Sequence, residues 1–429
     1  MSKMVVRKMY FLFPLFIMYV GFLMSSAFST EGSLNVDKSP VLSAVNDSVI
    51  YINSCGVLNQ AGRTYVLTQS ITTTGTCFKI QDSDIVLNGN GYTITGDGGV
   101  GDVGVYADFA DNTVIKNLGI DNFYHSIFFH AGSRNRISNN KLRNGGLAIH
   151  MEFSHDNLIE NNTIENYSSN GIVFEHSGNR NTFLGNKIRN VAVGFASVGG
   201  LISDSLFKDN EIFNTSIVAL NLYNFVNGEV INNKVQISQG DAIYTSGDIL
   251  LKNNSVINTN SMTYDLIANG NNLNLVDMSH IGKYQIFGST FGAQNFLVGD
   301  SRYGKISFLS INQDISGASL SDDIQIKNNS VTLKTSLNPG LNVPAQITLY
   351  NIGNRGFANP AIKRNFENCP SNVCMALTPL DAQNVVFNVT GFAYPTTTYR
   401  IGDGNRGAFG PNIHPVGCYS KNGTCPEIY

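Results

Sequence analysis

The segment "IENNTIEN" at residues 159–166 is the key to the fold, because closely related segments recur along the chain. They are "ISNNKLRN" at 137–144, "FLGNKIRN" at 183–190, "FKDNEIFN" at 207–214, "VINNKVQI" at 230–237 and "LKNNSVIN" at 251–258. Each has a central asparagine, an apolar residue three positions before it and an apolar residue two positions after it. This period-two alternation, interrupted at the asparagine, is typical of short strands joined by turns.

The central asparagines define the repeat length. They are Asn117, Asn140, Asn162, Asn186, Asn210, Asn233 and Asn254. A period of roughly 22 residues, with no room for a returning helix, predicts a parallel β-solenoid rather than a leucine-rich repeat, whose leucine-dense consensus is missing. We expect the asparagines to stack about 4.8 Å apart as a hydrogen-bonded ladder, with apolar columns filling the interior.

The period divides the chain into regions. The repeats and a preceding cap predict a β-helix over residues 45–282, since the first turn would otherwise expose an unpaired edge. From about residue 283, strand-like segments such as "YGKISFLSI" and "AQITLYNI" alternate with Pro, Gly and Asn turns. They predict an all-β ending with a small β-sandwich over 283–400 and an irregular, disulfide-closed tail over 401–429.

The N-terminal residues predict export. Lys3, Arg7 and Lys8 precede the uncharged stretch "MYFLFPLFIMYVGFLM", and small residues follow at 25–27. This order is typical of a signal peptide over residues 1–27, and the alternative is an uncleaved membrane anchor. We therefore predict a secreted or cell-surface protein that contacts a membrane only through that segment, if it is retained.

The six cysteines form three pairs of near neighbours in sequence. The pairs are Cys55 with Cys77, Cys369 with Cys374, and Cys418 with Cys425. In an exported chain an even number of cysteines predicts disulfides, and metal ligation is disfavoured because no C-x-x-C motif is present. Eight N-x-S/T sequons predict a glycoprotein if the host glycosylates exported proteins.

The charge composition excludes one class of partner. The formal net charge is −3 and charged residues make up 14% of the 429 residues. The chain therefore lacks the basic surface needed to gather phosphates, and we expect no nucleic-acid partner.

The repeats resemble those of a known superfamily. The rungs of this chain, with "GIVFEHSGNRN" and "LAIHMEFSHDN", resemble the right-handed parallel β-helix proteins of the pectin-lyase-like superfamily, including NosD-like carbohydrate-binding repeats. The opening "CGVLNQAGRTYVLTQSITTTGTC" is similar to the cap of exported archaeal β-helix surface proteins. The resemblance implies a ligand, typically an extended polysaccharide, along an outer sheet.

One candidate binding surface is basic. Arg143 and Arg189, with Glu165 between them, follow the ladder asparagines by three residues, and Lys141 and Lys187 follow by one. With Tyr124 they would bind a polysaccharide. The alternative is a cross-strand charge ladder on a solvated sheet.

A second candidate surface contains His130, His150 and Glu175, which we align as one outward column. Two histidines and a carboxylate would bind a metal ion or act as acid and base. Other registers place Glu152 beside Glu175, or His176 beside Glu152, so we assign neither a metal ligand nor a catalytic residue.

These observations favour an exported β-helix protein that recognises a polysaccharide or another cell-envelope component, or serves a structural or adhesive role, without catalysis. The alternative is a polysaccharide lyase, glycoside hydrolase or epimerase. We expect no cofactor, although a lyase would use calcium. The sequence motifs of polygalacturonases and alginate epimerases are absent.

Overall fold

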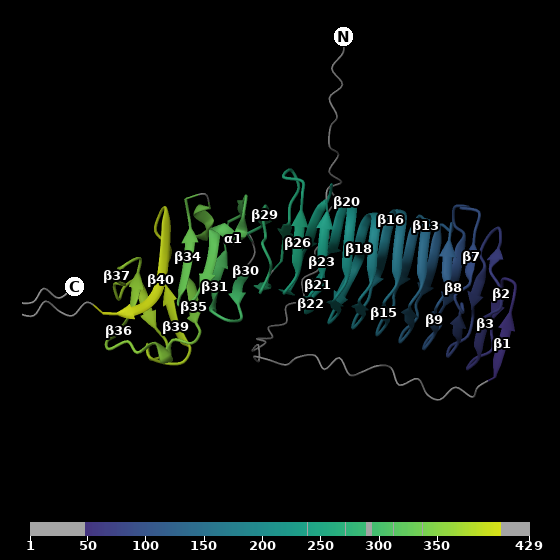
Figure 1. Ribbon diagram of the computed structural model, residues 1–429, viewed down its shortest axis with the longest axis horizontal. Coiled ribbons are helices and arrows are strands. Elements are labelled where there is room, and N and C mark those ends of the chain that lie inside the picture. The colour runs from purple at the N-terminus through teal and green to yellow at the C-terminus, as the bar shows by residue number, and fades with distance from the viewer. Residues whose placement is uncertain are drawn as a thin grey trace, which may run out of the picture. The chain divides into compact units, whose positions relative to one another are not determined.

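Short parallel strands stack in columns along a right-handed β-solenoid of about ten turns (Figure 1). The computed structural model describes residues 48–404 except 238, 271, 289–293, 312 and 337. These residues all belong to one compact unit. The predicted signal peptide, and the predicted Cys418–Cys425 pair in the tail, lie outside the described residues. Within the described part of the chain, no helix is long and apolar enough to cross a membrane.

Each solenoid turn contributes a strand to each of three columns. The first column is β1 (Val49–Ile52), β3 (Thr64–Leu67), β6 (Val86–Asn88), β9 (Val114–Lys116), β12 (Arg136–Ser138), β15 (Leu158–Glu160), β17 (Thr182–Leu184), β19 (Leu206–Lys208), β22 (Gly228–Ile231), β25 (Ile249–Lys252), β28 (Asn272–Val276) and β30 (Gln294–Asp300). All of these neighbours pair in parallel, as the repeat predicts.

The other two columns share one 19-stranded sheet, because some strands bend from one column into the next. The second column is β4 (Ile71–Thr72), β7 (Thr93–Thr95), β10 (Gly119–Asp121), β13 (Lys141–Gly145), the first parts of β16 (Thr163–Ser177), β18 (Lys187–Ser203) and β20 (Glu211–Leu222), then β23 (Lys234–Ile237) and β26 (Ser255–Asn258). The third column is β2 (Gly56–Leu58), β5 (Phe78–Ile80), β8 (Val103–Asp108), β11 (His125–His130), β14 (Leu147–Glu152), the second parts of β16, β18 and β20, then β24 (Asp241–Thr245), β27 (Leu266–Ala268) and β29 (Tyr284–Ile286). A short strand, β21 (Phe225–Val226), pairs with the end of β18.

The two adjacent asparagines in several of the repeats have different structural roles. In the pairs at 139–140, 161–162, 232–233 and 253–254, the first asparagine adopts a left-handed backbone with φ between 52° and 59°. Asparagine tolerates this conformation better than most residues, so it turns the chain between two strands. The second asparagine is buried.

The buried asparagines form the predicted ladder from Asn140 to Asn254. Along it each side-chain Nδ2 donates to the Oδ1 of the next asparagine at 2.9–3.0 Å. Each Oδ1 also accepts the backbone N–H of the preceding ladder residue, for example Asn162 N to Asn186 Oδ1 at 3.1 Å. The ladder therefore satisfies buried polar groups at a turn that strand pairing leaves open.

The prediction for Asn117 is wrong, because this residue lies one position outside the ladder. Asn117 is exposed with φ 54°, and the buried position belongs to Leu118, whose N–H donates to Asn140 Oδ1 at 3.1 Å. The shift explains why this repeat breaks the apolar rule, since Ile120 rather than Gly119 faces the core.

A second buried ladder was missed from the sequence. The backbone N–H of Asn135 donates to Asn157 Oδ1 at 2.8 Å, and Asn157 Nδ2 donates to Asn181 Oδ1 at 3.0 Å. These residues recur with the same period but stand before, rather than within, the conspicuous motif.

Apolar columns fill the interior as expected. One buried column is Ile94, Ile120, Leu142, Ile164, Ile188, Ile212, Val235 and Val256. On the first column of strands the rings of Phe183 and Phe207 stack with centroids 4.2 Å apart. The Cys55–Cys77 disulfide joins the first turns, and Cys369–Cys374 closes a short C-terminal loop, so both predicted pairings are confirmed.

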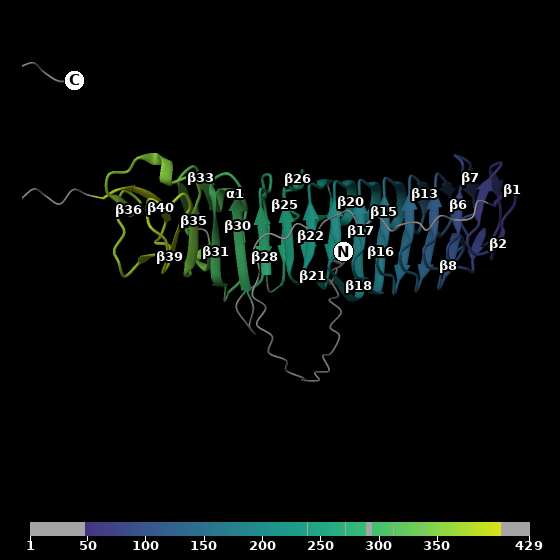
Figure 2. The same cartoon turned by 90° about the horizontal axis from the view of Figure 1, so that it is seen from below.

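Antiparallel strands follow the solenoid. β31 (Gly304–Ile311), β35 (Ala345–Leu349), β39 (Val385–Val389) and β38 (Cys374–Ala376) extend the first column's sheet beyond β30 (Figure 2). A separate five-stranded sheet comprises β33 (Ile324–Lys327), β34 (Ser330–Lys334), β40 (Thr396–Asp403), β36 (Pro360–Arg364) and β37 (Glu367–Asn368). The remaining elements are α1 (Leu320–Asp323), η1 (Pro339–Leu341), η2 (Gly353–Arg355) and β32 (Ile315–Gly317).

Packing between these two sheets is sandwich-like. Phe387 and Tyr399 meet between them with ring centroids 6.3 Å apart. Parallel pairing continues to β30, beyond the point at which the repeat fades from the sequence.

Candidate functional site

A column of polar residues lies on the outer face of the third strand column. Asp108, His130, Glu152 and Glu175 pair in register across β8, β11, β14 and β16. The residues just before them, Ala107, Phe129, Met151 and Phe174, are fully buried. Since side chains alternate between the faces of a strand, the polar column points outward.

His150 belongs to the neighbouring outward column, beside Phe128 and Val173. The expected single column of His130, His150 and Glu175 is therefore wrong. His130 pairs with Glu152 on the next turn of the solenoid, whereas His150 comes two positions before Glu152 and pairs with Phe128. The alternative register that places Glu152 beside Glu175 is the observed one.

The side chains of the two columns nevertheless converge. His150 Nε2 lies 3.4 Å from Glu152 Oε1 and 3.6 Å from Glu175 Oε2. His130 Nδ1 is hydrogen-bonded to Asp108 Oδ1 at 2.8 Å, and its Nε2 lies 4.0 Å from Glu152 Oε2. Within the described residues, His150, Glu152 and Glu175 are the group whose donor atoms could hold a metal ion, with one atom from each inside a 4.8 Å cluster.

Burial controls the protonation of the histidines. Burial lowers the pKa of His150, although the Glu175 and Glu152 carboxylates oppose that shift. Burial, with the neighbouring His150, lowers the pKa of His125 to about 4. Both imidazoles are therefore neutral at pH 7, and each has a nitrogen lone pair able to accept a proton or bind a cation.

Aromatic rings surround this cluster. The Phe128 ring stacks on His150 with centroids 4.5 Å apart and an interplanar angle of 6°. Phe109 and Phe153 approach His130 edge-on, at 5.2 and 6.2 Å. The predicted sugar-stacking residue Tyr124 is exposed and contacts His125 edge-on at 4.8 Å, so it lies on the rim of the same surface.

Four residues at one corner of successive turns have left-handed backbones. Phe109, Ala131, Phe153 and His176 have φ values of 50°, 54°, 46° and 71°. Most other non-glycine residues with positive φ in the solenoid are asparagine or aspartate, which tolerate it more readily. This conformation costs a non-glycine residue about 1–3 kcal/mol. Ala131 adopts it as well, so the turn at this corner requires it, and the rings of Phe109, Phe153 and His176 are carried there at successive turns.

The predicted basic surface lies elsewhere, on the second strand column. Arg143, Glu165 and Arg189 pair in register, and Glu165 contacts both arginines, with 3.4 Å from Arg143 Nε to Glu165 Oε2. Lys187 Nζ lies 3.8 Å from a carboxylate oxygen of Glu211. This arrangement is the cross-strand charge ladder that was the alternative interpretation. Lys141 and Arg143 also line a surface hollow of about 410 Å³ together with Asp121.

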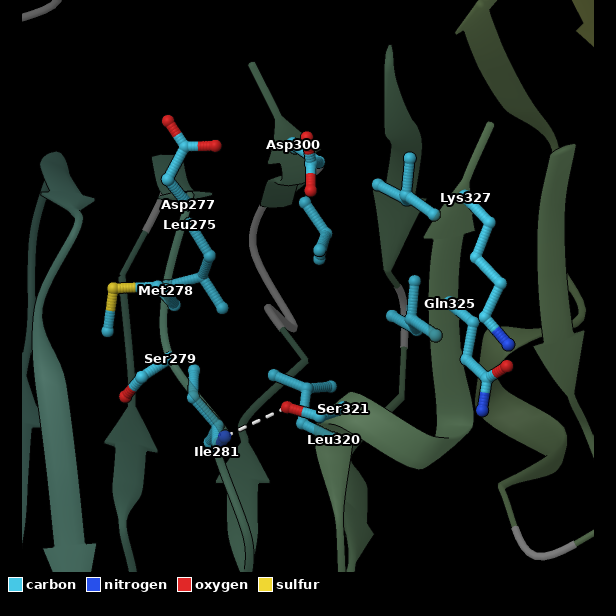
Figure 3. A pocket seen from close by; sticks show the side chains of 14 residues that line it. Leu275, Asp277, Met278, Ser279, Ile281, Asp300, Leu320, Ser321, Gln325 and Lys327 are labelled. Carbon is cyan, nitrogen blue, oxygen red and sulfur yellow. Dashed lines mark hydrogen bonds between the residues drawn. The ribbon is translucent and has the colours of Figure 1, made fainter. Parts of the chain in front are cut away.

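Another cavity, of about 310 Å³, lies where the solenoid meets the antiparallel strands (Figure 3). Aliphatic side chains such as Leu275 and Leu320 line it, and Asp277, Asp300 and Lys327 add charge. The backbone N–H of Ile281 donates to Ser321 Oγ at 2.8 Å at its edge. It contains none of the residues predicted to form a functional site.

Sequence reasoning missed Asp108, His125, Phe109, Phe128 and Phe153. A signal was present, because five of the seven histidines of the chain lie between residues 125 and 176. Their common surface became visible only once the register was known.

Comparison with protein families matches residues 84–297 to the family described as "Periplasmic copper-binding protein (NosD)". Comparison with curated proteins finds no match. Among solved structures, the PfbA surface adhesin of Streptococcus pneumoniae is 12% identical with a TM-score of 0.46, over 59% of this chain and 80% of that one. An alginate lyase from Paenibacillus is 18% identical with a TM-score of 0.38, over 51% and 88%. The Dettilon tailspike protein is 10% identical with a TM-score of 0.38, over 83% and 86%.

Proposed function

We propose that this chain, in which residues 84–297 form a NosD-like right-handed parallel β-helix domain, is an exported protein that binds an extended polysaccharide. The binding surface is the outer face of β8, β11, β14 and β16. Two disulfides, which persist in oxidising compartments, support the extracytoplasmic location.

The observation that carries the proposal is the set of exposed aromatic rings beside carboxylates. Phe109 is 69% and Phe153 45% exposed, and both occupy positive-φ positions next to His130. Exposed rings present an apolar face to a sugar ring, while Asp108 and Glu175 accept hydrogen bonds from its hydroxyls. Equivalent side chains on successive turns repeat about every 4.8 Å, which suits a ligand that is itself a polymer.

The basic ladder is a poorer candidate for an acidic polymer. Glu165 already lies between Arg143 and Arg189 and partly neutralises them. A ligand there would have to compete with existing ion pairs, whereas Phe109 and Phe153 pack against His130 and His176 and keep much of their ring surface exposed.

The test is retention of the purified protein on a panel of immobilised acidic and neutral polysaccharides. We expect retention on at least one member, and a roughly 2- to 12-fold weaker affinity after Phe153→Ala, from the loss of about 0.5–1.5 kcal/mol of ring contact. Tyr51→Ala is the matched control, because Tyr51 is 72% exposed on β1, outside the proposed surface. Failure to bind any polymer, or equal affinities for the two variants, would contradict the proposal.

A second candidate is a glycoside hydrolase or polysaccharide lyase using the same surface. It is favoured by the neutral His150, which could accept a proton, and by Glu152 and Glu175, whose nearest donor oxygens lie within the 4.8 Å cluster. The distance between these two carboxylates is closer to that in retaining glycosidases than to that in inverting ones. Mass spectrometry of the incubated polymers separates the two functions, since only an enzyme yields shortened products.

A further inference from the structure

We propose that His150, Glu152 and Glu175 form a binding site for one transition-metal dication of the Zn²⁺ class on the outer face of the solenoid. The site is a property of the chain alone and does not depend on polysaccharide binding. It rests on the geometry of three side chains and on the unmet bonding capacity of one of them.

The spacing of the donor atoms suits a tetrahedral ion. Two ligands about 2.1 Å from a tetrahedral Zn²⁺ lie about 3.4 Å from each other. His150 Nε2 lies 3.4 Å from Glu152 Oε1 and 3.6 Å from Glu175 Oε2. All three donor atoms could therefore reach a single ion with small side-chain movements.

His150 supplies the independent observation. His150 is 7% exposed, and within the described part of the chain neither ring nitrogen makes a well-aligned hydrogen bond, although Nε2 lies within ion-pair distance of the Glu152 and Glu175 carboxylates. A buried polar atom without a good hydrogen bond is costly, and such atoms in folded proteins are generally satisfied by water or an ion. A cation beside Nε2 would satisfy the nitrogen lone pair and neutralise the two carboxylates together.

The surroundings hold the three ligands in place. Phe128 stacks flat on the His150 ring and fixes its plane. On the other side, His130 is hydrogen-bonded to Asp108 and lies 4.0 Å from the second carboxylate oxygen of Glu152. Contacts behind the ligands orient them in this way in metal sites.

The ligand set selects the kind of metal. Ca²⁺ requires six to eight oxygen ligands and Mg²⁺ retains most of its water, whereas an imidazole nitrogen favours Zn²⁺ and neighbouring transition metals. Three protein ligands leave a coordination position for water or another small ligand. The Glu175 side chain is 33% exposed, so that position opens toward solvent.

The experiment is isothermal titration of the EDTA-treated full chain with zinc sulfate in the absence of polysaccharide. We expect one high-affinity site per chain. Glu175→Gln and Glu152→Gln should each weaken it at least tenfold, because each amide keeps the shape of the side chain but removes the charge. His280→Gln is the control, since His280 is an exposed histidine outside the cluster and its loss should leave the affinity unchanged.

Urea midpoints equal to that of the wild type would confirm that the two glutamine variants fold. The proposal is overturned if the wild-type chain shows no saturable one-to-one binding, or if both glutamine variants bind zinc as tightly as the wild type does. Because no polymer is present, this result is independent of the polysaccharide retention assay.

Discussion

Replacing Asn186 by alanine should remove one rung of the buried ladder and sharply lower stability. The Asn186 side chain makes four hydrogen bonds. Its Nδ2 donates to Ile159 O at 2.8 Å and to Asn210 Oδ1 at 3.0 Å, and its Oδ1 accepts from the backbone N and the Nδ2 of Asn162 at 3.1 and 3.0 Å. The side chain is fully buried, so water cannot replace these partners.

The expected loss follows from the groups left behind. Asn186→Ala leaves two buried N–H groups of Asn162 without an acceptor, namely the backbone N–H and one of the two on Nδ2, which keeps its bond to Ile137 O at 2.8 Å. Asn210 Oδ1 keeps the bond from the Asn186 backbone at 2.9 Å. At about 1–3 kcal/mol for each unsatisfied buried group, we expect the free energy of unfolding to fall by about 2–6 kcal/mol. The same turn offers a matched control in Asn190→Gly, because Asn190 is exposed with φ 55° and glycine tolerates that backbone. The control should change stability by less than about 1 kcal/mol.

Equilibrium urea unfolding measures both variants. Far-UV circular dichroism and tyrosine fluorescence are suitable probes, because the chain has 18 tyrosines and no tryptophan. Agreement of the two probes would show a single cooperative transition. A loss below about 1 kcal/mol for Asn186→Ala, or an equal loss for Asn190→Gly, would refute the ladder's role in stability.

Two further perturbations test the cap and the histidine cluster. Replacing both Cys55 and Cys77 by serine opens a 22-residue loop and should cost about 3 kcal/mol, seen as a lower thermal midpoint; an unchanged midpoint would show that the first turns need no covalent link. The pKa of His125 is about 4 in the folded chain against an ordinary value of 6.5, so between these values the unfolded chain binds more protons and stability is lost as pH falls. His125→Gln should therefore reduce the difference in unfolding free energy between pH 7 and pH 4.5 by about 1–2 kcal/mol, after allowance for partial solvent screening. If the variant shows the same pH dependence as the wild type, a lowered pKa of His125 is not the cause.

The buried amide ladder and the charge ladder on the outer surface differ in what they contribute to stability. Buried Asn140 and its successors satisfy one another, so each depends on its neighbours above and below. In the Arg143, Glu165 and Arg189 ladder the two arginine side chains are 49% and 56% exposed, whereas Glu165 is buried between them. Solvent screens the exposed arginines, so replacing either one should be tolerated better than replacing a residue of the buried amide ladder.

The amino-acid sequence alone was enough to predict the solenoid, because a fold built from one repeated unit has a sequence with the same period. In each turn an asparagine such as Asn162 is followed two positions later by an apolar residue such as Ile164. When similar turns stack, equivalent residues form columns. The Cys55–Cys77 and Cys369–Cys374 pairs were predicted separately, from the even number of cysteines and the short distance in sequence between the partners. The repeat rule failed at Asn117, where a one-residue shift places Leu118 in the ladder although the neighbouring residue is still an asparagine.

Which outer residues meet was settled only by the folded chain. A strand's side chains alternate with a period of two, so a slip of one or two residues in the turn between His130 and Glu152 rearranges every outward neighbour. Sequence reasoning found His150 and Glu175 but assigned His130 to their column, whereas the register pairs His130 with Glu152. The convergence of His150 with two carboxylates also requires side chains from adjacent columns to lean together, and no repeat pattern encodes that. The fold could thus be predicted from the repeat. The site could not, because it depends on loop lengths and side-chain packing that differ from one turn of the solenoid to the next.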